Sequence, residues 1–230
     1  MEEYRISDDV YEQIKDFSWL TEEQKLLVDK LILNKEIKER YIKFRLCKGC
    51  KQPKSAADWC QPCYYKRFQE DFENWTSGNP AIDKFIQNIQ LKANIKEEVI
   101  EWVEYNDLEN VEYLAKGGFG IVYKAIWRQG KIHTWNFDSN RWKRDRSQRV
   151  VLKYIYNSQD NIAEFLREVE SHVIANELGS VGVIRCYGIT KNPETNEYMM
   201  IMQQGMNGSL RQSLDENFNS LNWILKLDML

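Results

Sequence analysis

The spacing of apolar residues divides the chain into a helical first half and a strand-rich second half. In the first 45 residues, apolar side chains recur three or four positions apart, which is the period of a helix with one buried face. Thr21 and Gln24 form a capping box, which predicts the start of the main helix. Helical spacing returns over residues 64–75 and again after Asn79 and Pro80, which suit the cap and the first position of a helix.

From residue 111 the pattern changes to short runs rich in Val, Ile and Tyr, which are typical of β-strands. These runs are VEYLA, IVYKAIW, VVLKYIY, VIRCYGIT and YMMIMQ. One helical pattern, over residues 161–176, lies between the third and the fourth run. This order predicts a separate α+β unit. The seven acidic residues from Glu97 to Glu112 indicate a solvated helix and linker in front of it.

Composition narrows the class of protein without identifying it. The 230 residues carry 32 Lys and Arg against 35 Asp and Glu, and this net charge of −3 excludes a strongly basic nucleic-acid binder. No apolar run approaches the ~20 residues of a membrane span. The N-terminus lacks the basic start and the apolar stretch of a secretory signal. We therefore expect a cytoplasmic protein, with a nuclear location as the alternative, and no membrane contact.

Four of the five cysteines form two CxxC pairs, Cys47/Cys50 and Cys60/Cys63, separated by nine residues. In a reducing compartment such pairs point to a metal site rather than to disulfides, and zinc takes four thiolates in a tetrahedron. Nearby lysines would offset the negative charge of that site. We expect structural zinc; metal-free thiol turns and a redox disulfide are the alternatives. Cys186, in an apolar run, is expected to be buried.

Basic and aromatic residues near the cysteines raise a second possibility, a nucleic-acid interface over residues 43–65. A zinc staple that holds two helices together is the preferred interpretation, so nucleic acid is not an expected partner. A second basic run, residues 141–149, belongs to an insertion that also contains Trp135 and Trp142. We interpret this insertion as an extended, solvated β-hairpin.

The string LAKGGFGIVYKA, residues 114–125, places three glycines in a tight reversal between two strands. Glycine lets the backbone come close to a phosphate, whose oxygens the N–H groups can bind; a plain β-turn is the alternative. Lys153 lies in the apolar run VVLK, where an unpaired lysine is costly. Glu168 follows fifteen residues later at the edge of the helical stripe. We expect an ion pair that directs the ammonium group towards phosphates; a surface lysine and a solvated glutamate are the alternative.

The order of these features resembles that of the protein kinase superfamily. GGFGIVYKA resembles the Gly-rich loop, VVLK the lysine strand, EFLREVE the helix of the paired glutamate, and RCYGIT and YMMIMQ the next two strands. NGSLRQSL and LNWILKLDML resemble the two helices after the hinge. The closer resemblance is to the tyrosine-kinase-like branch, and within it to the expanded kinase-like proteins of arbuscular mycorrhizal fungi. Those proteins have a helical, cysteine-bearing N-terminal region.

The resemblance implies an ATP site that works with magnesium. Lys153 would contact the α- and β-phosphates and would be held by Glu168, and these two are the implied catalytic residues. Leu114, Val122 and Val151 would enclose the adenine. The full set implied for ATP binding is Leu114, Ala115, Gly117, Gly118, Phe119, Gly120, Val122, Val151, Lys153, Met202, Gln203 and Gly205.

Two of these positions depart from the family pattern, and a third has a defined place in it. Ala115 replaces the first glycine of the loop, and Val151 replaces a smaller alanine beside the adenine. Met202 falls at the gatekeeper position. It is followed by the hinge, residues 203–205, whose backbone would hydrogen-bond the adenine.

The resemblance places the fold in the α+β class, as a kinase N-lobe of five antiparallel strands and one helix. The expected parts are a helical region at 1–45, a four-cysteine zinc knuckle or ribbon at 46–65, a helical linker at 66–106 and a truncated kinase domain at 107–230. In the family, an H-x-D motif orients the acceptor hydroxyl and a D-F-G string holds magnesium. The 230 residues contain neither.

The expected function is therefore ATP binding and phosphoryl transfer to protein Ser, Thr or Tyr in signalling. We expect this chain to be a fragment of such a kinase, inactive by itself. The expected partners are ATP and a protein substrate or partner kinase. The alternative is a catalytically inactive kinase-like regulator with a zinc-stapled N-terminal region.

Overall fold

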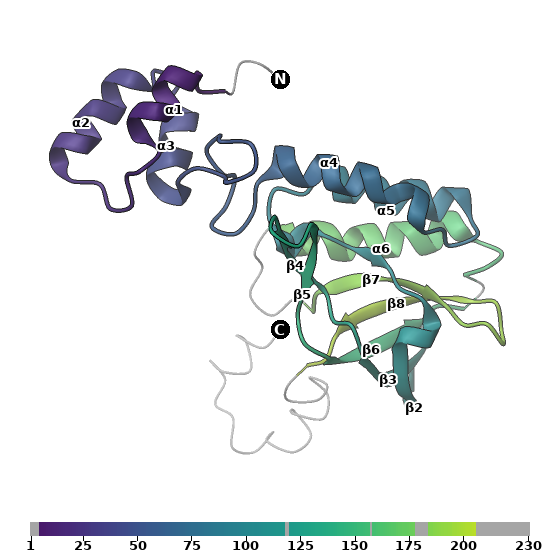
Figure 1. Ribbon diagram of the computed structural model, residues 1–230. Coiled ribbons are helices and arrows are strands. Elements are labelled where there is room, and N and C mark those ends of the chain that lie inside the picture. Colours follow the sequence, from purple (N-terminus) through teal and green to yellow (C-terminus); the bar gives the residue numbers. More distant parts are fainter. Residues whose placement is uncertain (1–4, 118–119, 157, 178–183, 206–230) are drawn as a thin grey trace, which may run out of the picture.

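A computed structural model describes residues 5–117, 120–156, 158–177 and 184–205. The two helices expected after the hinge lie outside these residues. Helices occupy the first part of the chain and a sheet with one covering helix the second (Figure 1). Among the described residues, no helix has the length and apolar character that crossing a membrane requires.

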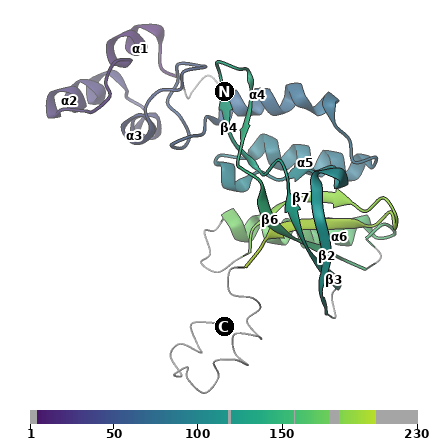
Figure 2. The ribbon, with the colours of Figure 1, turned by 60° about the horizontal axis from the view of Figure 1, so that its bottom comes forward.

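Three short helices form the N-terminal unit: α1 (Asp8–Ile14), α2 (Glu22–Leu31) and α3 (Lys35–Phe44). The predicted capping box is confirmed, because the Thr21 side chain accepts from the Gln24 N–H while the Gln24 side chain accepts from the Thr21 N–H. The core of this three-helix unit consists of Ile6, Ile14, Val28, Ile32, Ile37 and Tyr41. In Figures 1 and 2 this unit lies beyond one end of α4, to which the cysteine-bearing loop joins it.

Two longer helices follow, α4 (Gln61–Asp71), which ends in the short 3₁₀ turn Phe72–Asn74, and α5 (Pro80–Lys92). The predicted start of α5 is confirmed. The Asn79 side chain accepts from the Ala81 and Ile82 N–H groups, and Pro80 occupies the first turn, where the missing N–H costs no hydrogen bond.

The main sheet contains the five predicted strands, all antiparallel. They are β2 (Leu108–Gly117), β3 (Gly120–Trp127), β6 (Gln148–Tyr154), β7 (Cys186–Lys191) and β8 (Tyr198–Gln203). A sixth strand, β1 (Glu101–Trp102), extends the sheet in the order β1-β7-β8-β6-β3-β2 and pairs with β7 in parallel. The predicted helix is α6 (Ile162–Glu177). In Figure 1 α6 lies between α5 and the sheet.

The prediction of a solvated helix and linker from Glu97 to Glu112 is wrong. The segment forms two 3₁₀ turns, Lys96–Glu98 and Tyr105–Asp107, and the strand β1 between them. Its apolar residues Val99, Ile100 and Val103 are buried, whereas six of its seven acidic residues are exposed or only partly buried. β1 approaches β7 so closely that a Cβ on Gly188 would collide with the backbone of Glu101.

Glu101 is the exception among these acidic residues, because it is buried. Its carboxylate accepts from the Ile132 N–H at 2.9 Å and forms an ion pair with Arg144. Burial raises the pKa of Glu101, and the charge of Arg144 opposes that rise. A buried carboxylate needs such partners, so this pair fastens the inserted hairpin to the edge of the sheet.

The inserted hairpin is confirmed as β4 (Ile132–Asn136) and β5 (Arg141–Arg144). Its tip, residues 136–141, is exposed as predicted, but the rest of it packs on other elements. The Trp142 ring stacks on Phe68 of α4 with ring centres 4.6 Å apart and lies 6.5 Å from the ring of Trp59. The Tyr64 hydroxyl lies 2.7 Å from the Thr134 hydroxyl oxygen. An aromatic residue on each strand favours packing over solvation, because large rings contribute much buried area.

The main prediction for this part of the fold concerns Trp59. Its side chain is 2% exposed and its Nε1 donates to the Ala93 carbonyl at 3.1 Å. We expect Trp59→Ala to lower the free energy of unfolding by about 3–5 kcal/mol, because it leaves a large cavity. Trp19, which is 86% exposed, supplies the control. We expect Trp19→Ala to change the free energy of unfolding by less than about 0.5 kcal/mol. Chemical denaturation followed by circular dichroism measures both, and equal effects would contradict the prediction.

Candidate functional site

The strand β6 places the predicted lysine at the centre of the sheet. Lys153 is paired with Val122 of β3 on one side and with Met200 of β8 on the other. Side chains alternate between the faces of a strand, so Val151 and Lys153 share a face. Met202, paired with Val151, lies on the same face. Residues predicted to meet the adenine and the phosphates are therefore neighbours on one side of the sheet.

The predicted ion pair is present in the structure. Lys153 Nζ donates to Glu168 Oε1 of α6 at 2.8 Å. The hydrogen bond from Lys153 lowers the pKa of the Glu168 carboxyl, against the opposing effect of partial burial. The side chains of Lys153 and Glu168 are 24% and 43% exposed, so the pair is open to a ligand on one side.

Sequence reasoning missed a third member of this group, His172. Its Nε2 lies 3.6 Å from Glu168 Oε1, one helical turn further along α6. Burial lowers the pKa of His172, and the nearby charge of Lys153 acts in the same direction. The i,i+4 spacing from Glu168 was the available signal. A cleft of about 230 Å³ lies beside the ion pair. It is lined by Lys153 and Glu168 themselves and by Ile155, Glu164, Arg167 and Ser171.

The Gly-rich turn joins β2 to β3 next to the end of the lysine strand. Gly117 and Gly120 are paired with each other, while Gly118 and Phe119 lie outside the described residues. Gly120 has a φ of 148°, and a Cβ there would collide with the carbonyl oxygen of Tyr154. Only glycine fits this close approach. The turn is thereby held against the residue that follows Lys153.

The remaining predicted contacts lie at the two ends of this face. Leu114 is exposed, as are Ala115 and Gly117, so the outer part of β2 is open to solvent. At the other end Met202 is 6% exposed, and the Gln203 N–H donates to the Arg185 carbonyl at 2.8 Å. Gln203 and Gly205 are exposed. Their backbone therefore lies at the rim of the sheet face that carries Lys153.

The four paired cysteines converge on one point. Their Sγ atoms all lie within 4.8 Å of one another, with 3.7 Å from Cys47 to Cys63 and 3.5 Å from Cys50 to Cys60. A tetrahedral zinc site with Zn–S bonds of about 2.3 Å has S···S edges of about 3.8 Å, so the set fits zinc. Contacts among the thiols lower the pKa of Cys47 and raise that of Cys60.

The fifth cysteine, Cys186, lies apart from this set, as predicted. It is buried in β7. Burial raises the pKa of the Cys186 thiol to about 12. A thiol that stays protonated is neither a nucleophile nor a metal ligand, so Cys186 contributes to packing.

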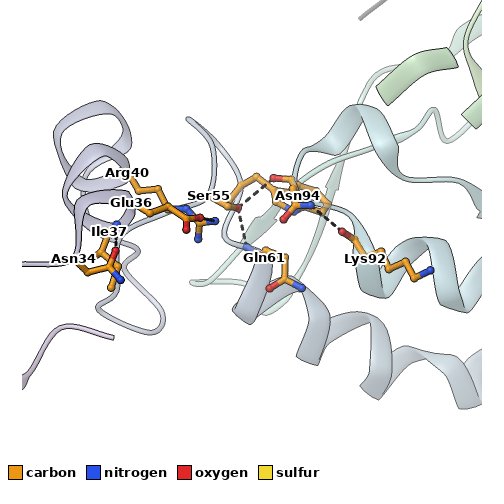
Figure 3. Close-up of polar contacts among 9 residues, drawn as sticks. Asn34, Glu36, Ile37, Arg40, Ser55, Gln61, Lys92 and Asn94 are labelled. Atoms are coloured by element: carbon orange, nitrogen blue, oxygen red, sulfur yellow. Dashed lines mark hydrogen bonds and ion pairs between the residues drawn. The ribbon is translucent and has the colours of Figure 1, made fainter. Parts of the chain in front are cut away.

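This cysteine cluster stands at the junction of two units. The turn of the first pair is fastened to the N-terminal unit, because Gln52 exchanges two hydrogen bonds with the backbone of Ile6, at 2.7 and 3.2 Å. The second pair opens α4. Figure 3 shows the contacts beside it, where Ser55 Oγ accepts from the Gln61 N–H at 3.0 Å and donates to the Asn94 carbonyl at 3.2 Å. A metal at this point would join both units.

Comparison with known proteins identifies the second half of the chain. A family model described as protein tyrosine and serine/threonine kinase matches residues 108–230. A probable serine/threonine-protein kinase of Dictyostelium discoideum, roco5, is 32% identical over 129 residues, which are 54% of this chain and 4% of that protein. A second from the same organism, gdt4, is 24% identical over 98 residues, 42% of this chain and 5% of that protein.

The chain thus spans a small fraction of the length of either relative. The family model nevertheless covers more than half of this chain and begins where β2 begins. Because the matched residues are those that build the antiparallel sheet and its ion-paired helix, this chain belongs to the protein tyrosine and serine/threonine kinase family.

Proposed function

We propose that the sheet and α6 form the ATP-binding lobe of a protein kinase, whose complete domain transfers phosphoryl groups to protein hydroxyls. The observation that carries this proposal is the 2.8 Å contact between Lys153 Nζ and Glu168 Oε1. In kinases this pair must be in place for phosphoryl transfer, because the lysine orients and neutralises the nucleotide phosphates.

The surroundings of the pair support the same proposal. Val122, Val151 and Met202 give the sheet face an apolar part suited to adenine, next to the charged part suited to phosphates. Gly120 comes close to the end of β6, and backbone N–H groups of a Gly-rich turn can bind phosphate oxygens. An apolar pocket with a few polar groups at one end is the usual form of a nucleotide site.

We also propose that the cysteine cluster holds structural zinc. All four ligand positions are filled by thiolates, so no coordination site is left open for a substrate. The cluster lies between the N-terminal unit and α4, where its role would be to fix one against the other. Zinc held by these four thiolates would crosslink the N-terminal unit and α4.

The test of the nucleotide proposal is the variant Lys153→Met. We expect its ATP affinity to be about 10- to 100-fold weaker, because a charged hydrogen bond contributes about 1.5–3 kcal/mol. Lys84, exposed on α5, provides the matched control, and Lys84→Met should bind ATP as the wild type does. Titration calorimetry measures both. Unchanged affinity in Lys153→Met would overturn the proposal and favour a kinase-like module that acts by binding another protein.

The lowered pKa of Glu168 predicts how pH acts on this pair. A carboxyl whose pKa is depressed on folding stabilises the native state above its ordinary pKa and loses that contribution as pH falls through the depressed value. We therefore expect the wild type to be more stable than Glu168→Gln above the ordinary value of 4.5 and to lose this advantage at lower pH. Urea denaturation across that range measures the difference. An advantage that grew on acidification would contradict the assignment.

The zinc proposal predicts one equivalent of zinc for each chain. Chelation, or the double variant Cys47→Ser/Cys60→Ser, should remove the zinc. The chain between residues 45 and 60 should then become open to proteases, because no metal links the N-terminal unit to α4. Cys186→Ala is the control for loss of a thiol elsewhere and should keep its zinc. Elemental analysis and limited proteolysis measure both effects. A metal content independent of Cys47 and Cys60 would exclude the site.

A further inference from the structure

The face of α6 that carries its apolar stripe is buried in part by residues from outside the kinase family match. The stripe consists of Phe165, Val169 and Val173, each at most 4% exposed. They belong to one core with Ile82 and Ile86 of α5. Figure 1 shows α5 lying along α6, on the side away from the sheet.

A third isoleucine, Ile100, extends this contact. Ile82 and Ile86 are fully buried and Ile100 is 1% exposed. All three precede residue 108, where the family match begins. The chain therefore supplies its own cover for this helix from a segment that comes before the kinase domain.

α5 is itself held in a defined position. At one end Asp83 accepts from the Ser77 N–H at 2.8 Å and from the Thr76 hydroxyl at 2.6 Å. At the other end the Gln90 amide donates to the Ile100 carbonyl at 2.9 Å. A helix fixed at both ends presents a rigid surface to α6 rather than a loosely attached one.

The ion pair alone is a weak anchor for α6. The side chains of Lys153 and Glu168 are 24% and 43% exposed, and ion pairs open to solvent contribute little to the free energy of unfolding. Glu168 directly precedes Val169, so any tilt or rotation of α6 that moves Val169 also moves the carboxylate. The apolar packing of the stripe, to which the sheet contributes residues of β7 and β8 and α5 contributes Ile82 and Ile86, therefore has more influence on the position of Glu168 than the pair itself.

We propose that α5 is an intramolecular positioning element for α6, and that Ile82 and Ile86 are positioning residues that keep Glu168 in contact with Lys153. This inference rests on the proposed nucleotide function for its effect on ATP, and it adds a regulator of that site within the same chain. Any partner or modification that loosened α5 would weaken the ion pair and the nucleotide site together.

The test compares Ile86→Ala with Asn88→Ala, an exposed position on the same helix. Two properties are measured: the pKa of the Glu168 carboxyl by carbon-13 NMR, and ATP affinity by calorimetry. We expect Ile86→Ala to raise the pKa of Glu168 towards its ordinary value and to weaken ATP binding about fivefold or more, within the range of allosteric couplings. Asn88→Ala should change neither. If Ile86→Ala does not fold, Ile86→Val should shift both properties less and in the same direction.

Repeating the Ile86→Ala substitution in the Glu168→Gln variant separates loss of Glu168 positioning from general destabilisation of the fold. In Glu168→Gln the carboxylate is already removed, so Ile86→Ala should lower the melting temperature there as before but should not weaken ATP binding further. An Ile86→Ala effect on ATP of equal size in both backgrounds would overturn the proposal, as would an unchanged Glu168 pKa. If the wild type itself binds no ATP, the proposed nucleotide function fails, and the Glu168 titration alone still decides whether α5 positions α6.

Discussion

A lysine in the middle of an apolar strand needs a negative partner, and this requirement organises the second half of the molecule. Lys153 is flanked by β3 and β8, and among the described elements its partner comes from the helix that covers the sheet. That partner is Glu168 of α6, at 2.8 Å. Because one ion pair half open to solvent cannot fix a helix, the position of α6 depends on what packs against its apolar stripe. Part of that packing comes from β7 and β8, and part from α5.

A second group of contacts links the first half of the chain to the same sheet. The inserted hairpin leaves the sheet between β3 and β6 and packs its tryptophans on α4, close to the cysteines. Glu101 and Arg144 fasten the hairpin to β1, and β1 pairs with β7. Of the elements before the family match, α4, α5 and β1 are therefore built into the kinase lobe rather than attached to it by a flexible connection.

Local signals made part of this structure predictable. The capping box at Thr21, the Asn79–Pro80 helix start and the five strand runs each depend on neighbouring residues, and the structure confirms them. The error between Glu97 and Glu112 has a tertiary cause, since Ile100 is buried by α5 and α6, which no pattern within the segment reveals. The packing of Trp142 on Phe68 is likewise between residues far apart in the sequence. In the site, the residues Lys153 and Glu168 and the four paired cysteines were predictable from their chemistry and spacing. The only sequence signal for His172 was its i,i+4 spacing from Glu168.

A continuous path of packed elements leads from the cysteine cluster to the ion pair. Cys60 and Cys63 begin α4, α4 packs along α5, and α5 covers the helix that carries Glu168. Packed interiors transmit displacements because they contain little free space. A change at the cysteines could therefore reach Glu168 without any contact between the two sites, provided that α5 moves as a unit. The hydrogen bonds of Asp83 and Gln90 at the two ends of α5 favour such a movement as a unit, and α5 is therefore one packed route between the cysteine cluster and Glu168.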